Sequence, residues 1–97
     1  MSKDEKMKVT YLTSFLKMFD DLTKERQTEV SNLVSDLINL FVKRETPVKG
    51  LGLKKLRKNL WEVRLGLKQR ILFKLEADNL IFIIFGTHED IRRFLCR

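Results

Sequence analysis

The sequence predicts an α+β fold in which an N-terminal strand and a two-helix hairpin pack on a mainly antiparallel sheet of about four strands. Three observations support this prediction. Apolar residues recur at helical spacing in the first half of the chain, and apolar and polar residues alternate at strand spacing in the second half. A continuous apolar run at residues 80–85 is typical of a central strand that is covered on both faces.

The first half begins with a short strand and continues into two helices. Residues 8–12 have the β-branched and aromatic character of a strand. Thr13 is expected to cap a short helix over residues 13–22, and Thr23 is expected to start a longer one. The longer helix has one apolar stripe at spacings of three and four, which predicts that it faces the core. The stripe consists of Val30, Leu33, Val34, Leu37, Ile38 and Phe41.

The second half reads as three antiparallel strands and a short tail, after a loop marked by Pro47 and Gly50. Residues 60–67 and 69–75 alternate, and Asp78-Asn79 is a turn signal before the apolar strand. Thr87 begins a last segment that is expected to form a helical turn through residue 95. One face of the sheet is expected to hold Trp61, Val63, Leu65 and Leu67, and the other Glu62, Arg64, Arg70 and Lys74.

The whole chain is expected to form one domain, residues 1–97, with residues 1–7 as a flexible tail, because a chain of this length has room for one modest core. Residues 1–48 contain eight basic and eight acidic residues, whereas residues 49–97 contain twelve basic and five acidic ones. All of the net charge of +7 therefore lies in the second half. This asymmetry favours an anionic partner, which is RNA, DNA, an acidic protein or a membrane surface, over a merely soluble charged surface.

Cysteine content and hydropathy favour a cytoplasmic protein without a membrane partner. Cys96 is the only cysteine, so an internal disulfide is excluded, as suits a reducing compartment. The N-terminal residues are charged and polar, unlike a signal peptide. The apolar runs are much shorter than the roughly 20 residues that a membrane-spanning helix needs.

Three segments of the second half form a joint pattern. They are residues 53–67, with Trp61-Glu62-Val63-Arg64, then Gln69-Arg70-Ile71-Leu72-Phe73, and Phe85-Gly86-Thr87-His88-Glu89-Asp90-Ile91. Together they resemble the RelE/ParE toxin superfamily. The superfamily pattern has an L/W-E-x-R strand, a Y-R-I/V-x-F/Y strand, an apolar strand and a polar G-x-[HKR] end. The resemblance covers residues 50–95, and the N-terminal half matches only in its layout. The joint spacing of the segments is fairly specific, whereas each segment alone is a weak signal.

The resemblance implies the toxin of a type II toxin–antitoxin pair. Its RelE-like branch consists of ribosome-dependent mRNA endoribonucleases that arrest translation, so this branch implies mRNA, the ribosome and a cognate antitoxin as partners. The toxin would be a monomer within its toxin–antitoxin complex. Two alternatives stay open: a ParE-like, non-catalytic inhibitor of DNA gyrase, and an inactive RelE-fold protein that binds nucleic acid.

RNA cleavage of this kind uses the substrate's own 2′-hydroxyl as nucleophile and needs neither a metal nor a cofactor. It needs a base, a cation for the phosphate and an acid for the leaving oxygen. Arg70 lies where the resemblance places a phosphate-binding arginine, although an ion pair with Glu62 or Glu76 is the alternative. His88, the only histidine, matches a position of general acid or base catalysis, and an ordinary surface or capping residue is the alternative.

Glu62 and Arg64 are two residues apart on one strand and therefore share a face. Arg64 matches a position that is basic in RelE-like toxins. Glu62 departs from the lysines of other members, and it is expected either to act as the general base or to orient Arg64 or Arg70.

The remaining basic residues are candidates for gripping RNA phosphates, a contribution that is independent of base sequence and sensitive to salt. Phe94 lies where RelE-like toxins have a tyrosine, and it is expected either to stack on a base or to pack in the core. Together the RNA-binding candidates are Lys54, Lys55, Arg57, Lys58, Lys68, Lys74, Arg92, Arg93 and Phe94.

Overall fold

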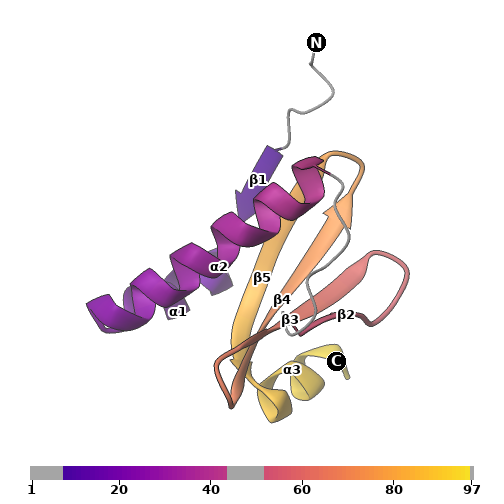
Figure 1. Cartoon of the computed structure of the whole chain (residues 1–97). Helices are drawn as coiled ribbons and strands as arrows, with labels where there is room; N and C mark the ends of the chain where they lie inside the picture. The colour runs from indigo at the N-terminus through magenta and orange to yellow at the C-terminus, as the bar shows by residue number, and fades with distance from the viewer. Residues whose placement is uncertain (1–7, 44–51, 97) are drawn as a thin grey trace.

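The computed structural model describes residues 8–43 and 52–96. The expected tail at residues 1–7 and the loop with Pro47 and Gly50 lie outside them. The elements follow the predicted α+β order (Figure 1). They are β1 (Lys8–Tyr11), α1 (Thr13–Asp20), α2 (Lys24–Lys43), β2 (Leu53–Lys55), β3 (Leu60–Leu65), β4 (Gln69–Glu76), β5 (Asn79–Thr87) and α3 (His88–Leu95).

The strands form one sheet in the order β1-β5-β4-β3-β2. β1 runs parallel to β5, and every other pair is antiparallel, so the mainly antiparallel prediction is confirmed. The sheet has five strands rather than about four, because Leu53–Lys55 pairs with β3 as an additional edge strand. This segment is too short and too basic for its alternation to be read from the sequence.

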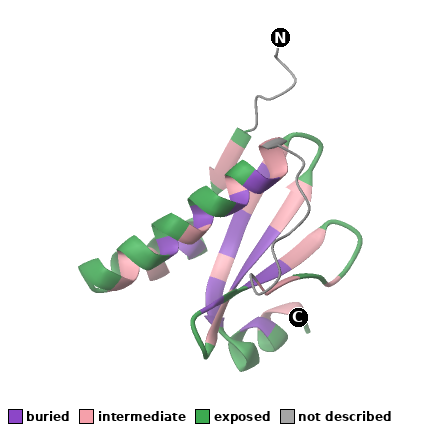
Figure 2. Ribbon diagram, in the orientation of Figure 1, coloured by how far each residue is buried: buried purple, intermediate pink, exposed green. Residues whose placement is uncertain are grey.

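The α2 stripe packs on one face of the sheet, as its spacing predicts. Val30, Val34 and Leu37 are buried in one cluster with Phe73 and Phe82 of the central strands. Figure 2 shows the same polarity along α2, with buried positions toward the sheet and exposed positions on the outer side. Burial of this apolar stripe, at roughly 25 cal/mol per Å², is the main force that holds the helix on the sheet.

The two predicted helix caps have different outcomes. Thr23 does cap α2, because its hydroxyl oxygen accepts a hydrogen bond from the backbone N–H of Arg26 at 3.2 Å. Thr13 does not cap α1; the N-cap position belongs to Leu12, whose side chain makes no capping bond. The sheet decides this boundary, since the Leu12 N–H donates to the carbonyl of Phe82 at 3.0 Å and the chain turns from there into the helix.

The helix α3 confirms the helical segment expected after Thr87. It also covers part of the second face of the sheet, a placement that the sequence did not predict. Leu72, Ile83 and Ile91 are buried there in a separate cluster. The register between β4 and β5 shifts near Leu72, so that Leu72 pairs with Ile84 and Phe73 pairs with Phe82. Ile83 is the additional residue at this irregularity, and it joins Leu72 beneath α3. The α3 side of the sheet is therefore apolar beneath the helix and polar at Glu62, Arg64 and Arg70, and the central strand is covered on both faces, as its apolar run predicts.

The alternating pattern also predicts the wrong position for Leu67. The strand β3 ends at Leu65, and the chain then turns through Gly66 at a φ of +70°. Leu67 lies in this turn and is 96% exposed, so it does not belong to the apolar face.

Candidate functional site

Three strands place a row of residues on the α3 side of the sheet. Arg64 of β3 lies directly opposite Arg70 of β4, and Arg70 lies directly opposite Gly86 of β5. Directly opposed like charges destabilise a sheet unless a counter-charge lies between or near them. The two guanidinium groups therefore make this row a candidate site for an anion.

One carboxylate partly offsets the positive charge of the two arginines. Oε2 of Glu62 lies 3.3 Å from Nε of Arg70, and the Glu62 side chain is only 11% exposed. Glu62 is one of the two ion-pair partners that the sequence predicted as alternatives for Arg70. The other, Glu76, pairs with Lys74 at 3.3 Å. No described residue makes an ion pair with Arg64, which is exposed. The row thus keeps one excess positive charge.

The backbone beside Arg64 is closely packed. The N–H of Arg64 donates to the carbonyl of Gly52 at 3.2 Å. Gly52 has a φ of +78°, and a Cβ atom placed on it would lie 2.6 Å from Cβ of Arg64. Only glycine fits both the conformation and the contact, so Gly52 supports the base of the Arg64 side chain.

The junction between β5 and α3 is held by a reciprocal capping box. The Thr87 hydroxyl accepts from the Asp90 N–H at 3.2 Å, and an Asp90 carboxylate oxygen accepts from the Thr87 N–H at 3.0 Å. The hydrogen bond from the Thr87 backbone N–H to the carboxylate, and after it the interaction with the Thr87 side chain, lower the pKa of Asp90 below its ordinary value of 3.8. A Cβ atom on Gly86 would lie 2.7 Å from this carboxylate, so the absent side chain makes room for the cap. The junction is thereby fixed next to Arg70.

His88 is the first residue of α3 and is exposed. The preceding residue, Thr87, pairs with Gln69 of β4, which is the neighbour of Arg70. The topology therefore brings His88 to the same end of the sheet as the arginine row. Lys68, in the β3–β4 turn, and Arg92, one helical turn after His88, are exposed at this end as well.

The predicted basic run on β2 is divided between the two faces. Lys54 pairs with Glu62 and therefore lies on the side of the arginine row. Lys55 pairs with Trp61 on the opposite side, and its Nζ lies 5.7 Å from the centre of the Trp61 ring. This distance is that of a cation–π contact, so Lys55 covers an aromatic of the main core and is separated from Arg70 by the sheet.

The other predicted RNA-binding residues do not gather at the row. Arg57, Lys58 and Lys74 line a groove of about 700 Å³ at the opposite end of β4. Phe94 lines the same groove and packs against the cluster beneath α3. Arg93 lies on α3, with its guanidinium 3.8 Å from the Asp90 carboxylate.

Gly52, Gly86 and Asp90 were not predicted to support the site, and Gly86 entered only as part of the G-x-[HKR] pattern. The Thr87-x-x-Asp90 spacing is a capping signal and would have indicated Asp90. Gly52 had no such local signal, because its close neighbour Arg64 lies on another strand, whereas Asp90, the close neighbour of Gly86, follows in the next helical turn.

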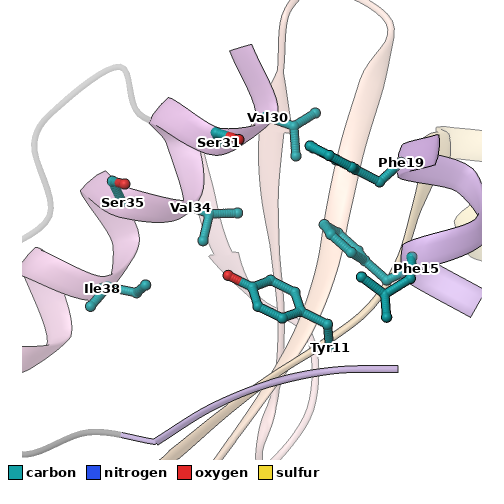
Figure 3. Close-up of a pocket in the computed structure, with 9 residues that line it drawn as sticks. Tyr11, Phe15, Phe19, Val30, Ser31, Val34, Ser35 and Ile38 are labelled. Carbon is teal, nitrogen blue, oxygen red and sulfur yellow. The ribbon is translucent and has the colours of Figure 1, made fainter. Parts of the chain in front are cut away.

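A second cavity lies between α1 and α2 and is unrelated to the row. It has a volume of about 400 Å³, and the lining side chains of Tyr11, Phe15 and Val34 point into it (Figure 3). Its polar groups are the hydroxyls of Tyr11, Ser31 and Ser35. The cavity therefore belongs to the packing of the helical hairpin.

Among residues 8–43 and 52–96, no group of three or more His, Cys, Asp or Glu side chains is placed to hold a metal ion. No helix in the same ranges is long and apolar enough to cross a bilayer.

Known proteins match this chain in structure but not in sequence: no family model and no curated protein matches it. The YoeB/ParE toxin from Agrobacterium tumefaciens is 26% identical and matches over 84% of this chain and 99% of its own, with a TM-score of 0.61. A chain of the archaeal RelE–RelB complex from Pyrococcus horikoshii is 16% identical over 84% and 93%, with a TM-score of 0.66. A chain of the DinJ–YafQ complex from E. coli is 20% identical over 89% and 98%, with a TM-score of 0.64.

The chain has the fold of the RelE/ParE toxins. The resemblance seen in residues 50–95 is thus confirmed at the level of the fold, and it extends to the N-terminal strand and helical hairpin.

Proposed function

We propose that the chain is the toxin of a toxin–antitoxin pair and that it cleaves mRNA on the ribosome. The observation that supports this proposal best is the meeting of Arg64, Arg70 and His88 at one end of the sheet. Two of the structural neighbours are toxins in complex with their antitoxins, RelE with RelB and YafQ with DinJ, which supports an antitoxin as partner.

The chemistry follows from the groups present. The 2′-oxygen of the RNA attacks the adjacent phosphorus and the bond from phosphorus to the 5′-oxygen breaks, which leaves a 2′,3′-cyclic phosphate and a 5′-hydroxyl. One proton leaves the 2′-hydroxyl and one is delivered to the 5′-oxygen. Arg70 and Arg64 are assigned to the phosphate, whose negative charge grows in the transition state. His88 is assigned to one of the two proton transfers.

Glu62 is assigned to orienting Arg70 rather than to proton transfer. Its carboxylate engages Nε of Arg70 and is nearly buried. With Nε occupied, the two terminal nitrogens of Arg70 remain for a phosphate, which they can bind through two parallel hydrogen bonds. Lys54, Lys68 and Arg92 surround this end and are assigned to neighbouring phosphates.

Primer extension on mRNA from cells that express the protein tests this proposal. Cuts within translated codons are expected, and they should fall by about 10²- to 10³-fold in Arg70→Ala and by about 10²- to 10⁴-fold in His88→Ala. Lys24→Ala, an exposed lysine on α2, serves as the control and should cut normally. Absence of cuts together with DNA breaks would favour inhibition of gyrase, and absence of both would favour an inactive nucleic-acid-binding protein.

A further inference from the structure

The cavity between α1 and α2 is part of the packing of the helical hairpin, but the side chains of the hairpin do not fill it. α1 lies on β5 and α2 extends toward β3, and a space of about 400 Å³ is left between the two helices. Protein interiors are normally packed as densely as organic crystals, so a space of this size is uncommon. We infer that the cavity is a binding site for a small, uncharged aromatic molecule that carries a hydroxyl group.

The walls of the cavity are apolar and are held in place by the core. Its floor is formed by Phe15, Val30 and Val34, which are buried in the main core cluster. The centre of the Tyr11 ring lies 5.7 Å from that of Phe15 and 5.5 Å from that of Phe82, so two neighbours fix its orientation. The volume lies within the range of roughly 300–1,000 Å³ that is typical of small-molecule sites. A flat aromatic molecule would therefore meet aromatic and aliphatic surface that is already formed.

Three hydroxyl groups border this apolar surface. Tyr11 is 40% exposed, and Ser31 and Ser35 are exposed on α2, so the hydroxyls lie toward the open side of the cavity. The two serines are four residues apart and share one face of the helix, and the Tyr11 hydroxyl points toward α2 (Figure 3). Within the part of the chain that the structure describes, none of the three hydroxyls makes a hydrogen bond to another residue. They are therefore available to a polar atom of a ligand.

The lining also selects against a charged ligand. Among the described residues, no Lys, Arg, Asp or Glu lines the cavity, and the remaining lining residues are Leu16, Phe19 and Ile38. A charged group that enters apolar surroundings loses its hydration and finds no counter-charge here. A hydroxyl group, in contrast, both donates and accepts hydrogen bonds, as the serine and tyrosine hydroxyls of the cavity do. An uncharged phenol or aromatic alcohol matches this lining.

The cavity is separate from the proposed RNA site. It lies on the face of the sheet that α1 and α2 cover, whereas the arginine row lies on the α3 side. None of the lining residues is assigned to phosphate binding or proton transfer. The inference therefore goes beyond the proposed function and does not depend on it.

2-Naphthol tests the inference on the full chain, because it is a flat aromatic molecule with one hydroxyl group that is uncharged at about pH 7. We expect a dissociation constant of about 1 mM or lower, in line with the ligand efficiencies of small molecules. Binding should shift the methyl resonances of Val30, Val34 and Ile38, which line the cavity. 2-Naphthoate has the same ring system and a negative charge, and it should bind at least about tenfold more weakly.

Two tryptophan variants of α2 test where the ligand binds. Ser35→Trp places a large ring at the mouth of the cavity and should weaken binding of 2-naphthol by at least about tenfold. Asn32→Trp is the matched control, because Asn32 is exposed on the same helix outside the lining, and it should leave the affinity unchanged.

The double variant Ser31→Ala/Ser35→Ala tests the hydroxyl groups. Alanine favours the helix, so α2 should persist, and the loss of hydrogen bonds to the ligand should weaken binding by about three- to tenfold. No binding of 2-naphthol, equal affinity for 2-naphthoate, or equal effects of the two tryptophan variants would overturn the inference. So would an unchanged or higher affinity in the alanine variant. None of these measurements involves RNA cleavage, so their outcome and that of the proposed function are separate.

Discussion

The ion pair between Glu62 and Arg70 is the most enclosed ion pair among the described residues. The two side chains are 11% and 27% exposed, whereas both partners of each other pair are at least 38% exposed. Because the Glu62 carboxylate is largely shielded from water, it is stabilised mainly by the Arg70 guanidinium. The carboxylate in turn holds the guanidinium in one orientation. The pair therefore links the stability of the sheet to the geometry of the candidate site.

Glu62→Gln should lower the free energy of unfolding by about 1–3 kcal/mol, less than for a fully buried pair because Arg70 is partly hydrated. Urea unfolding measures this loss. Glu76→Gln is the matched control, since it breaks the more exposed pair with Lys74 on the same strand and should cost at most about 1 kcal/mol. Equal losses in the two variants would contradict a special role for the enclosed pair.

Gly86→Ala should destabilise the protein by about 1–3 kcal/mol through overpacking, because the new Cβ would meet the Asp90 carboxylate at 2.7 Å. In an Asp90→Gly background the same substitution should cost much less, since the carboxylate and the Cβ atom at 2.9 Å, which together cause the strain, are both gone. A double-mutant cycle by thermal unfolding checks this coupling. Additive effects would show that the close approach has no energetic consequence.

Asp90 should make stability depend on pH in the acid range. Its pKa is lowered in the folded protein by the hydrogen bonds with Thr87, so the stabilisation is fully present above its ordinary value of 3.8. It is then lost as the pH falls from that value through the lower folded pKa, because protonation removes the charge that the cap favours. The free energy of unfolding, measured with urea between pH 5 and about pH 2, should therefore fall less steeply with decreasing pH in Asp90→Asn than in the unmodified protein. Parallel curves would contradict the prediction.

The substitutions Gly52→Ala and Gly66→Ala together separate the free-energy cost of a left-handed backbone from the cost of a steric overlap. Both glycines have positive φ, +78° and +70°, but only Gly52 has close neighbours. Gly66→Ala should cost about 1 kcal/mol for the left-handed conformation alone. Gly52→Ala should cost about 1–3 kcal/mol more, because its Cβ would overlap with Arg64. Chemical denaturation measures both losses, and similar values would mean that Arg64 moves freely away from Gly52.

Local patterns in the sequence were sufficient for most of the elements. The spacing of Val30, Val34 and Leu37 placed α2 on the sheet, and the alternation of residues 60–65 placed β3. The hydroxyls of Thr23 and Thr87 marked the starts of two helices. These features depend on residues within one or two turns, or within one strand, so periodicity and capping chemistry are enough to identify them.

The site depended on contacts between distant segments. The common end of Arg70 and His88 followed from the order of the apolar strand and its polar end. The enclosure of Glu62 instead required the neighbouring strands β2 and β4. Gly52, which precedes β2, likewise meets Arg64 of another strand. No spacing along the chain reports such contacts.

By itself, the sequence determined the α+β order of elements, the core stripe of α2, the basic second half and the arginines of one sheet face. Only the tertiary structure decided that α3 covers part of that face, that Lys54 and Lys55 lie on opposite sides, and that Arg57 and Lys58 border an apolar groove. The physical reason is strand pairing. The face on which a strand residue lies is decided by its partner and by irregularities such as the one beside Leu72, and both arise from packing between segments far apart in the chain.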